Sequence, residues 1–179
     1  NEPGIIGKVL DGGAWGVICP MVNTAAEAKA LVSACLYPPA GKRSSGPIRS
    51  SAYATTTPYQ SFANDEVLVM PMIETQEALD NLDAICSVKG IDGVYIGPSD
   101  LSLSLGCKPV FDDVDPPVAQ AIDHILARAK AHGIKAGVHN GRTDTARARL
   151  AKGFNFATVS SDARILIAGS QQILKEMRA

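Results

Sequence analysis

Two carboxylates close apolar segments of this chain, at points where buried strands are expected to end. Glu74 ends the apolar run at 66–74, and Asp100 follows the run at 93–98. Parallel strands bring their carboxyl ends to one edge of a sheet, where ligands bind. Mg²⁺ or Mn²⁺ takes one or two carboxylates and leaves its other positions to water and substrate. The pair therefore predicts a site for one hard divalent cation, which suits a bidentate 2-oxo acid.

The corner that carries Asp100 has a second possible use. It reads Gly97-Pro98-Ser99-Asp100 and opens a short helix expected near 100–105. Amide groups at the start of a helix bind anions. A ligand carboxylate could therefore lie on the amides of Ser99 and Asp100 while a cation on the Asp100 side chain holds its other end. Gly97 and Pro98 fix the corner and complete the predicted substrate-binding segment.

Both carboxylates also have an ordinary structural interpretation. A glutamate at a strand end is often solvated or caps the next helix, and Asp100 could simply stabilise the dipole of its own helix. Elsewhere in the chain the structural interpretation is favoured. Asp162 is expected to cap a helix, Arg43 and Arg49 to face solvent rather than an anionic substrate, and His139 to be structural rather than a pocket residue. His124 and His132 are expected on the surface, and Trp15 in packing.

The elements that would position these residues alternate between apolar runs and helical segments. The apolar runs predict strands buried on both faces. Helices are expected to start at a Pro at position 3, at Asn23 or Thr24 with Glu27 completing a capping box, and at Thr75. The predicted strands are 16–22, 66–74, 93–98, 134–139 and 154–160; the predicted helices include a short one at 58–65 and others at 116–132, 143–152 and 162–178.

This alternation predicts an α/β fold with a parallel sheet covered by helices. A closed (β/α)8 barrel typically needs about 250 residues, so the five predicted strands of this chain are too few to close one. The chain is then either a small open sheet or a barrel that lacks its first βα units. A helix ahead of the first predicted strand favours the second, with 1–179 as one partial barrel domain.

Composition excludes several classes of protein. The 179 residues are 46% hydrophobic and 20% charged with a net charge of −1, so no basic excess would attract nucleic acid or an anionic membrane. No apolar run reaches the roughly 18 residues of a membrane helix, and the first eight residues do not resemble a secretory signal. Four cysteines without a C-x-x-C pair predict reduced thiols and a cytoplasmic protein.

Several segments in order resemble one known family. They are VICPMVNTAAEAKALVSACLYPPAGKRSSGP, YQSFAND and VMPMIETQEALDNLDAICSVKGIDGVYIGPSDLSLSLG, and together they span essentially the whole chain. The combination of YPPAGxR, IET and GPxDLS is specific, whereas each motif alone is weak. The chain resembles the metal-dependent (class II) pyruvate aldolases of the 2,4-dihydroxyhept-2-enedioate aldolase family, which includes macrophomate synthase.

The resemblance implies a (β/α)8 TIM barrel of the phosphoenolpyruvate/pyruvate type, without its first two or three βα units in this chain. It implies Glu74 and Asp100 as metal ligands, and the amides of Ser99 and Asp100 as the pyruvate carboxylate site. Asp11 matches an aspartate that pairs with an upstream histidine across a subunit interface. Homo-oligomers, trimers or hexamers with an exchanged terminal helix, are implied as well.

The chain departs from the family pattern at a few positions. Met72 stands where glutamine is frequent, and Arg43-Ser44 where Arg-Gly is frequent. The arginine that stabilises the enolate and the histidine that pairs with Asp11 would lie upstream of Asn1. These departures leave the metal pair intact and place part of the catalytic set outside the sequence.

The function that follows is a carbon–carbon lyase dependent on Mg²⁺, Mn²⁺ or another divalent cation. It would form or cleave 4-hydroxy-2-oxo acids, with pyruvate and an aldehyde as small-molecule partners, through a pyruvate enolate that the metal stabilises. No lysine lies at a strand end in an obviously dry place, since Lys135 begins a strand at the other rim; this agrees with a mechanism without a Schiff base. The alternatives are a catalytically incomplete subunit that binds 2-oxo acids or serves assembly, and an oxaloacetate decarboxylase of the macrophomate synthase type. A phosphate-binding barrel is disfavoured because VSSDARIL lacks a glycine-rich loop.

Overall fold

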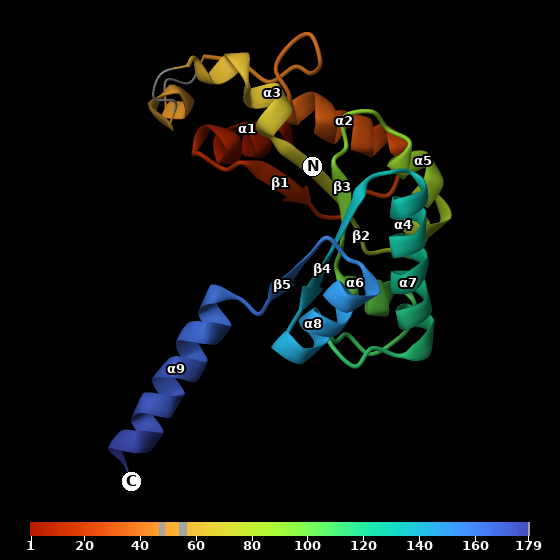
Figure 1. The fold of residues 1–179 in the computed structure, drawn as a ribbon, viewed down its shortest axis with the longest axis vertical. Helices are drawn as coiled ribbons and strands as arrows, with labels where there is room; N and C mark the ends of the chain where they lie inside the picture. The colour runs from red at the N-terminus through yellow and green to blue at the C-terminus, as the bar shows by residue number, and fades with distance from the viewer. Residues whose placement is uncertain (47–48, 54–56, 179) are drawn as a thin grey trace.

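A curved sheet of five parallel strands, in the order β1-β2-β3-β4-β5, forms the centre of the computed structural model (Figure 1). The structure describes residues 1–46, 49–53 and 57–178. All five predicted strands are present and parallel, which confirms the α/β expectation. They are β1 (Gly16–Cys19), β2 (Leu68–Ile73), β3 (Gly93–Ile96), β4 (Lys135–Asn140) and β5 (Phe156–Val159).

The first strand is shorter than predicted. It was expected to reach residue 22, but it ends at Cys19 because Pro20 has no amide hydrogen for the ladder and Met21 adopts a left-handed φ of 56°. The apolar residues that follow still contribute to the core, where Val22 is fully buried.

The helices fill the connections between the strands. They are α1 (Pro3–Asp11), α2 (Ala25–Cys35), α3 (Ala63–Glu66), α4 (Gln76–Asp80), α5 (Leu82–Cys86), α6 (Pro98–Ser104), α7 (Pro116–Ala131), α8 (Thr143–Lys152) and α9 (Asp162–Met177), with 3-10 turns at Arg49–Tyr53 and Tyr59–Ser61. The expected helix at 58–65 is therefore divided between a 3-10 turn and α3.

Predicted helix starts are largely confirmed. Thr24 accepts a hydrogen bond from the Glu27 amide while the Glu27 carboxylate accepts one from the Thr24 amide, which is a complete capping box. Thr75 caps α4. One expectation was wrong: Ser161 caps α9 through the Arg164 amide, and Asp162 is only the first residue of that helix.

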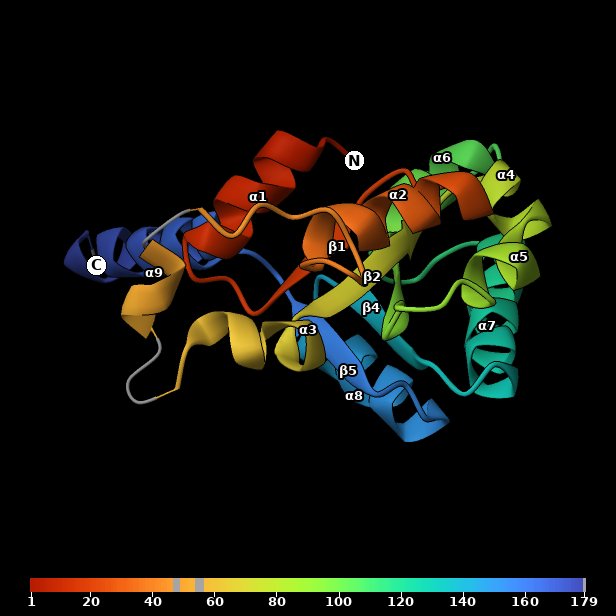
Figure 2. The same ribbon diagram turned by 90° about the horizontal axis from the view of Figure 1, so that it is seen from above.

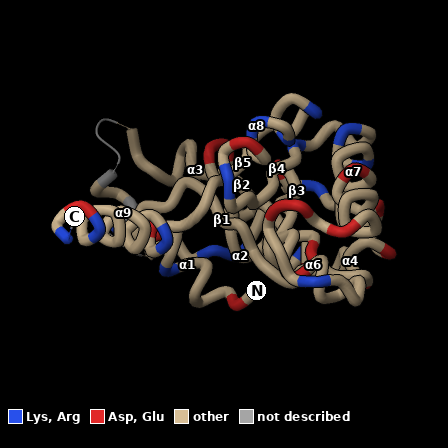
Figure 3. Tube along the Cα trace, turned by 90° about the horizontal axis from the view of Figure 1, so that it is seen from below, with Lys and Arg blue, Asp and Glu red and all other residues tan. Residues whose placement is uncertain are grey.

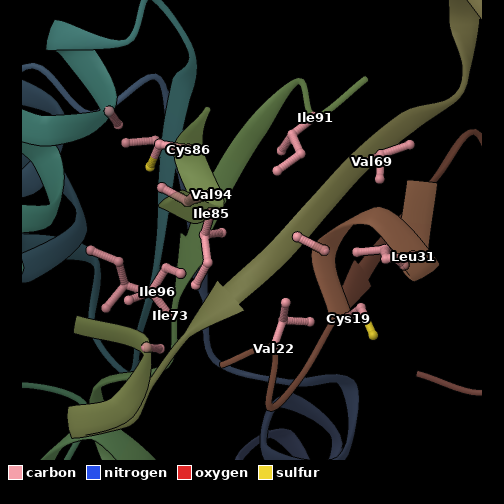
Figure 4. Close-up of a cluster of buried hydrophobic side chains, with 14 of the residues drawn as sticks. Cys19, Val22, Leu31, Val69, Ile73, Ile85, Cys86, Ile91, Val94 and Ile96 are labelled. Atoms are coloured by element: carbon pink, nitrogen blue, oxygen red, sulfur yellow. The ribbon is translucent and has the colours of Figure 1, made fainter. Parts of the chain in front are cut away.

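The core lies between the sheet and the helices that cover its outer face. Helix α2 packs on β2, α7 on β3 and β4, and α8 on β4 and β5. Alternate strand residues such as Val69, Ile73, Val94 and Ile96 are fully buried in this layer (Figure 4). Because side chains of a strand alternate between faces, the intervening residues, Glu74 and Gly97 among them, belong to the opposite, concave face.

Part of the concave face is open to solvent. Ile18 is 41% exposed and Leu68 is 51% exposed. Trp15 was expected in packing, but it is 55% exposed, and its ring stacks on the ring of Phe62. These apolar side chains line a hollow of about 310 Å³ at the start of β1 and β2.

Helix α9 extends away from the sheet (Figures 1 and 2), and none of its residues is buried within this chain.

Charges of both signs are spread over the chain (Figure 3). The four cysteines are free, as predicted. Among the helices in the described part of the chain, none combines the length and apolar character needed to cross a bilayer.

Candidate functional site

Glu74 lies at the carboxyl end of β2, and its side chain is almost completely buried, with 2% of its surface exposed. Its Oε1 atom accepts a hydrogen bond of 2.9 Å from the Met21 amide. Its Oε2 atom is buried and has no hydrogen-bond partner among the described residues. Burial raises the pKa of Glu74, the Met21 amide opposes that shift, and the negative charge of Asp100 raises the pKa further.

The space for this carboxylate exists because the neighbouring strand carries a glycine. A Cβ atom at Gly97 would lie 2.2 Å from Glu74 Oε2 and 2.9 Å from Met72 Cε. Gly97 has a φ of −99°, so the backbone conformation itself does not require glycine there. The requirement is steric, and it shows that the Glu74 carboxylate lies across the corner where β3 joins α6.

Asp100 is in the first turn of α6, directly after this corner, and its side chain is exposed. Pro98 begins the helix, and Ser102 Oγ donates a 2.7 Å hydrogen bond to the Pro98 carbonyl, which fixes the turn. The amides of Ser99 and Asp100 belong to the first turn, where amides have no partner within a helix. The structure thus brings Glu74, Asp100 and these two amides to one corner of the sheet.

The donor set at this corner suits a hard divalent cation. It offers one buried carboxylate oxygen without a partner and a second, accessible carboxylate that already acts on Glu74 electrostatically. Within the described residues, no three or more His, Cys, Asp or Glu side chains cluster in a way that could enclose a metal. A cation held here would therefore rely on two protein carboxylates, with substrate and water completing its coordination.

A second polar group continues the same layer of the concave face. Strand register aligns Ile73 with Ile96 and Ile96 with Val138, so the next residues, Glu74, Gly97 and His139, are level. His139 is paired with Thr158 on β5. His139 Nδ1 lies 2.9 Å from Thr158 Oγ1 and 3.4 Å from the Tyr95 hydroxyl, and the Tyr95 and Thr158 hydroxyls are also hydrogen-bonded.

Asp11 lies at the opposite end of the sheet. It ends α1, just before β1 begins, whereas Glu74 and Asp100 follow the ends of β2 and β3. Its Oδ1 atom accepts a 2.7 Å hydrogen bond from Arg43 Nη2. The structure therefore separates Asp11 from the carboxylate pair of its own chain.

Arg43 was expected to face solvent, and that expectation was wrong. Its guanidinium is buried, lies over the rings of Tyr37 and Tyr59, and pairs with Asp11. The hydrogen bonds to Asp11 and Tyr59 raise the pKa of Arg43 although its burial acts in the other direction. Both charges line a pocket of about 600 Å³ between α1 and α2. Arg49, the other loop arginine, is exposed.

Sequence reasoning did not find Met21, Tyr95 or Thr158. Met21 acts through its amide, which its left-handed backbone aims at Glu74, and a side-chain motif cannot show this. Tyr95 and Thr158 are ordinary strand residues in the sequence. The detectable signal was periodicity, and it applies to Tyr95: that residue lies between the buried Val94 and Ile96, which places its side chain on the concave face.

Comparison with known proteins places this geometry in context. Residues 1–168 match the family described as HpcH/HpaI aldolase/citrate lyase. A hydroxypyruvate/pyruvate aldolase of Rhizorhabdus wittichii is 47% identical over 179 residues, which are 100% of this chain and 71% of that protein.

Solved structures agree with this match. A crystal structure of an HpcH/HpaI aldolase/citrate lyase family protein from Burkholderia cenocepacia J2315 superposes with a TM-score of 0.86 at 31% identity, over 99% of this chain and 70% of the other. Macrophomate synthase superposes with a TM-score of 0.79 at 24% identity, over 99% of this chain and 64% of its own, and shares the fold.

Proposed function

The chain belongs to the HpcH/HpaI aldolase/citrate lyase family, and we propose that it is a divalent-metal-dependent aldolase that forms or cleaves 4-hydroxy-2-oxo acids. The observation that carries the proposal is the buried Glu74 Oε2 atom without a partner, beside Asp100 and a helix start. A relative 47% identical to this chain is named a hydroxypyruvate/pyruvate aldolase, which supports pyruvate or hydroxypyruvate as the donor.

Glu74 and Asp100 would hold the cation, Mg²⁺ or Mn²⁺. When bound, such a cation acts as a Lewis acid that draws electron density from the keto oxygen of the substrate. The Met21 amide holds Glu74 Oε1 and leaves Oε2 available to the cation. Gly97 keeps the space above its Cα atom free for that oxygen.

The substrate carboxylate would lie on the amides of Ser99 and Asp100. Pro98 presets the first turn of α6, and the Ser102 hydroxyl braces it through the Pro98 carbonyl. These bonds fix the direction of the two amides before substrate arrives, so little ordering is needed on binding. The carboxylate and keto group of a 2-oxo acid would then be held at a fixed orientation beside Glu74.

The complete catalytic unit would be a (β/α)8 barrel within a trimer or hexamer. Asp11 supports this proposal: it lies at the other end of its own sheet from Glu74 and Asp100, so we expect it to act at the site of a neighbouring subunit. The open concave face and the solvent-exposed apolar side chains of α9 give the chain surfaces for such neighbours. Free cysteines are consistent with a reducing compartment, and we place the protein in the cytoplasm.

Substitution at the carboxylate pair tests the proposal. Pyruvate released from a 4-hydroxy-2-oxo acid is measured with Mg²⁺ or Mn²⁺ and after chelation by EDTA. Glu74→Gln and Asp100→Asn should each lower kcat/KM by about 100-fold or more, because charge stabilisation at the reacting oxygen is lost. Glu77→Gln is the matched control, since Glu77 is an exposed glutamate in the first turn of α4.

Full activity in both pair variants would contradict the site. Calorimetric binding of pyruvate and Mg²⁺ by the wild-type protein without any turnover would instead favour a binding or assembly subunit.

A further inference from the structure

Three polar side chains from neighbouring strands meet on the concave face beside the proposed metal site. They are Tyr95 of β3, His139 of β4 and Thr158 of β5; the two hydroxyls are hydrogen-bonded to each other, and each lies within hydrogen-bond distance of His139 Nδ1. Phe111 packs edge-on against the imidazole with ring centroids 4.6 Å apart. The ring is therefore held on two sides.

The hydrogen bonds select one tautomer of His139. If the Tyr95 hydroxyl donates to Thr158 and the Thr158 hydroxyl donates to His139 Nδ1, every hydroxyl hydrogen has an acceptor. In the reverse direction, a protonated Nδ1 donates to Thr158 and Thr158 donates to Tyr95, and the Tyr95 hydrogen then has no acceptor among the described residues. The complete arrangement leaves Nδ1 unprotonated, so the proton of the neutral imidazole is on Nε2.

His139 is suited to remain neutral. Burial lowers its pKa, and the nearby Arg164 guanidinium lowers it further, while the Asp112 carboxylate acts in the opposite direction. Tyr95 is likewise held protonated, because burial raises its pKa more than the bond to Thr158 lowers it. Tyr95 can therefore donate to Thr158, and Thr158 can donate to the unprotonated Nδ1 atom of neutral His139.

The position of His139 relative to Glu74 would allow its Nε2–H group to contact a ligand on the concave face. Both residues belong to one layer of the concave face, and the residue level with them on the intervening strand is Gly97, which directly follows β3. Gly97 has no side chain of its own, and the Glu74 carboxylate and the Met72 methyl group lie over its Cα atom. His139 Nε2 makes no hydrogen bond within the described part of the chain, so it is available to a ligand bound on this face.

We propose that neutral His139, oriented by Thr158 and Tyr95, donates its Nε2 hydrogen to the oxygen of the aldehyde acceptor. The inference rests on the proposed aldolase function. During addition, the donor first loses a methyl proton to solvent, and its methyl carbon then bonds to the aldehyde carbon. The aldehyde oxygen gains the electron pair of the C=O π bond and takes a proton from water to become the 4-hydroxyl. His139 stabilises the charge on that oxygen, and the same contact serves the reverse cleavage.

Two readouts separate this role from the chemistry of the donor. The first is exchange of the pyruvate methyl protons with D₂O, followed by NMR with Mg²⁺, which needs no aldehyde. The second is aldol addition of pyruvate to glycolaldehyde. His139→Phe should lower kcat for addition on the order of 100-fold, as loss of one oxyanion donor does elsewhere, and leave the exchange rate unchanged.

Conservative variants and a surface control complete the experiment. His139→Gln, which keeps a side-chain N–H donor, should restore part of the addition rate. Thr158→Val should lower addition and shift the histidine ¹⁵N signals away from the Nε2–H tautomer, whereas Thr158→Ser should restore both. His124→Phe, on the exposed face of α7, should change neither readout.

The outcomes distinguish the inference from the function on which it rests. Equal loss of exchange and addition in both His139 variants, or loss of neither, would overturn the role of His139. A wild-type protein that catalyses neither reaction in the presence of Mg²⁺ or Mn²⁺ would overturn the proposed function itself.

Discussion

Glu74 is a carboxylate that the folded chain holds in a state unfavourable for its charge. Its Oε1 atom has a partner, its Oε2 atom has none among the described residues, and the side chain is buried. Such a group destabilises the fold when it ionises, which is a common property of functional positions. A cation that binds only the folded chain would offset this effect.

The unfavourable ionisation of buried Glu74 should appear in the pH dependence of the free energy of unfolding. The folded pKa of Glu74 is raised above the usual value of 4.5, so its ionisation disfavours folding once the pH exceeds that value and increasingly up to the folded pKa. Thermal unfolding without divalent cations should show Glu74→Gln gaining stability relative to wild type as pH rises from about 4 to 7. Glu77→Gln should show no such trend. A constant difference across the range would contradict the assignment.

Gly97 should be intolerant of even one methyl group. Gly97→Ala would place Cβ 2.2 Å from Glu74 Oε2, which forces the carboxylate to move. Overpacking of this kind costs about 1–3 kcal/mol, and activity should fall together with stability in urea unfolding.

Gly7→Ala is the matched control, because a Cβ at Gly7 meets no atom within 4 Å. In a helix interior that change should be neutral or stabilise by about 0.5–1 kcal/mol. Gly97→Ala with wild-type activity would show that the carboxylate position is not critical.

At the scale of elements, the loop between β1 and α2 contains both the cap of α2 and the amide that holds Glu74. The Thr24–Glu27 capping box fixes the first turn of α2, and Glu27 Oε2 also accepts the Asn23 amide. Two residues earlier, Met21 offers its amide to Glu74. The capping residues thus support the loop that positions the buried carboxylate.

Loss of the cap should be measurable in the free energy of unfolding. Thr24→Ala should lower it by about 1 kcal/mol, since an N-terminal amide of α2 loses its acceptor. Thr143→Ala is a fitting control, because α8 begins without a side-chain cap. An equal effect of the two substitutions in urea unfolding would argue against the capping box.

Much of this arrangement could be predicted from local patterns. Short sequence segments predicted the strand–helix alternation, the proline at the start of α1 and the capping box. The structure has all three where they were expected. Glu74 and Asp100 were predicted as a pair because ligands bind at the carboxyl edge of a parallel sheet, where polar residues directly follow apolar runs; the pair remains a prediction. Arg43 was misjudged because its burial depends on Tyr37, Tyr59 and Asp11, which no local pattern connects. The His139–Thr158 contact depends on strand register, which was not assigned from the sequence.

At the scale of the whole molecule, α9 carries apolar side chains that no other described residue of the chain covers. Among them are Ile165, Leu166 and Ile173, each more than half exposed. An exposed apolar helix of this kind is typical of an interaction surface, and we propose that it packs against a second copy of the chain, as in the proposed oligomer.

Charge placed on this surface should weaken assembly. Leu166→Lys should shift the protein to a smaller species in sedimentation velocity, because a buried unpaired ammonium is unfavourable in an interface. Gln171→Lys introduces the same charge on the same helix at a polar position and should leave the assembly intact. A wild-type protein that sediments as a monomer at all concentrations would refute the assignment.

Trp15 makes the open concave face visible to spectroscopy. It is the single tryptophan of the chain and stands at the rim of that face with more than half of its side chain in solvent. Indole fluorescence shifts to shorter wavelength when water is removed from around the ring. Any polypeptide that covers this part of the concave face, whether additional strands or another subunit, should therefore shift the intrinsic tryptophan emission to shorter wavelength. The measurement needs no added label.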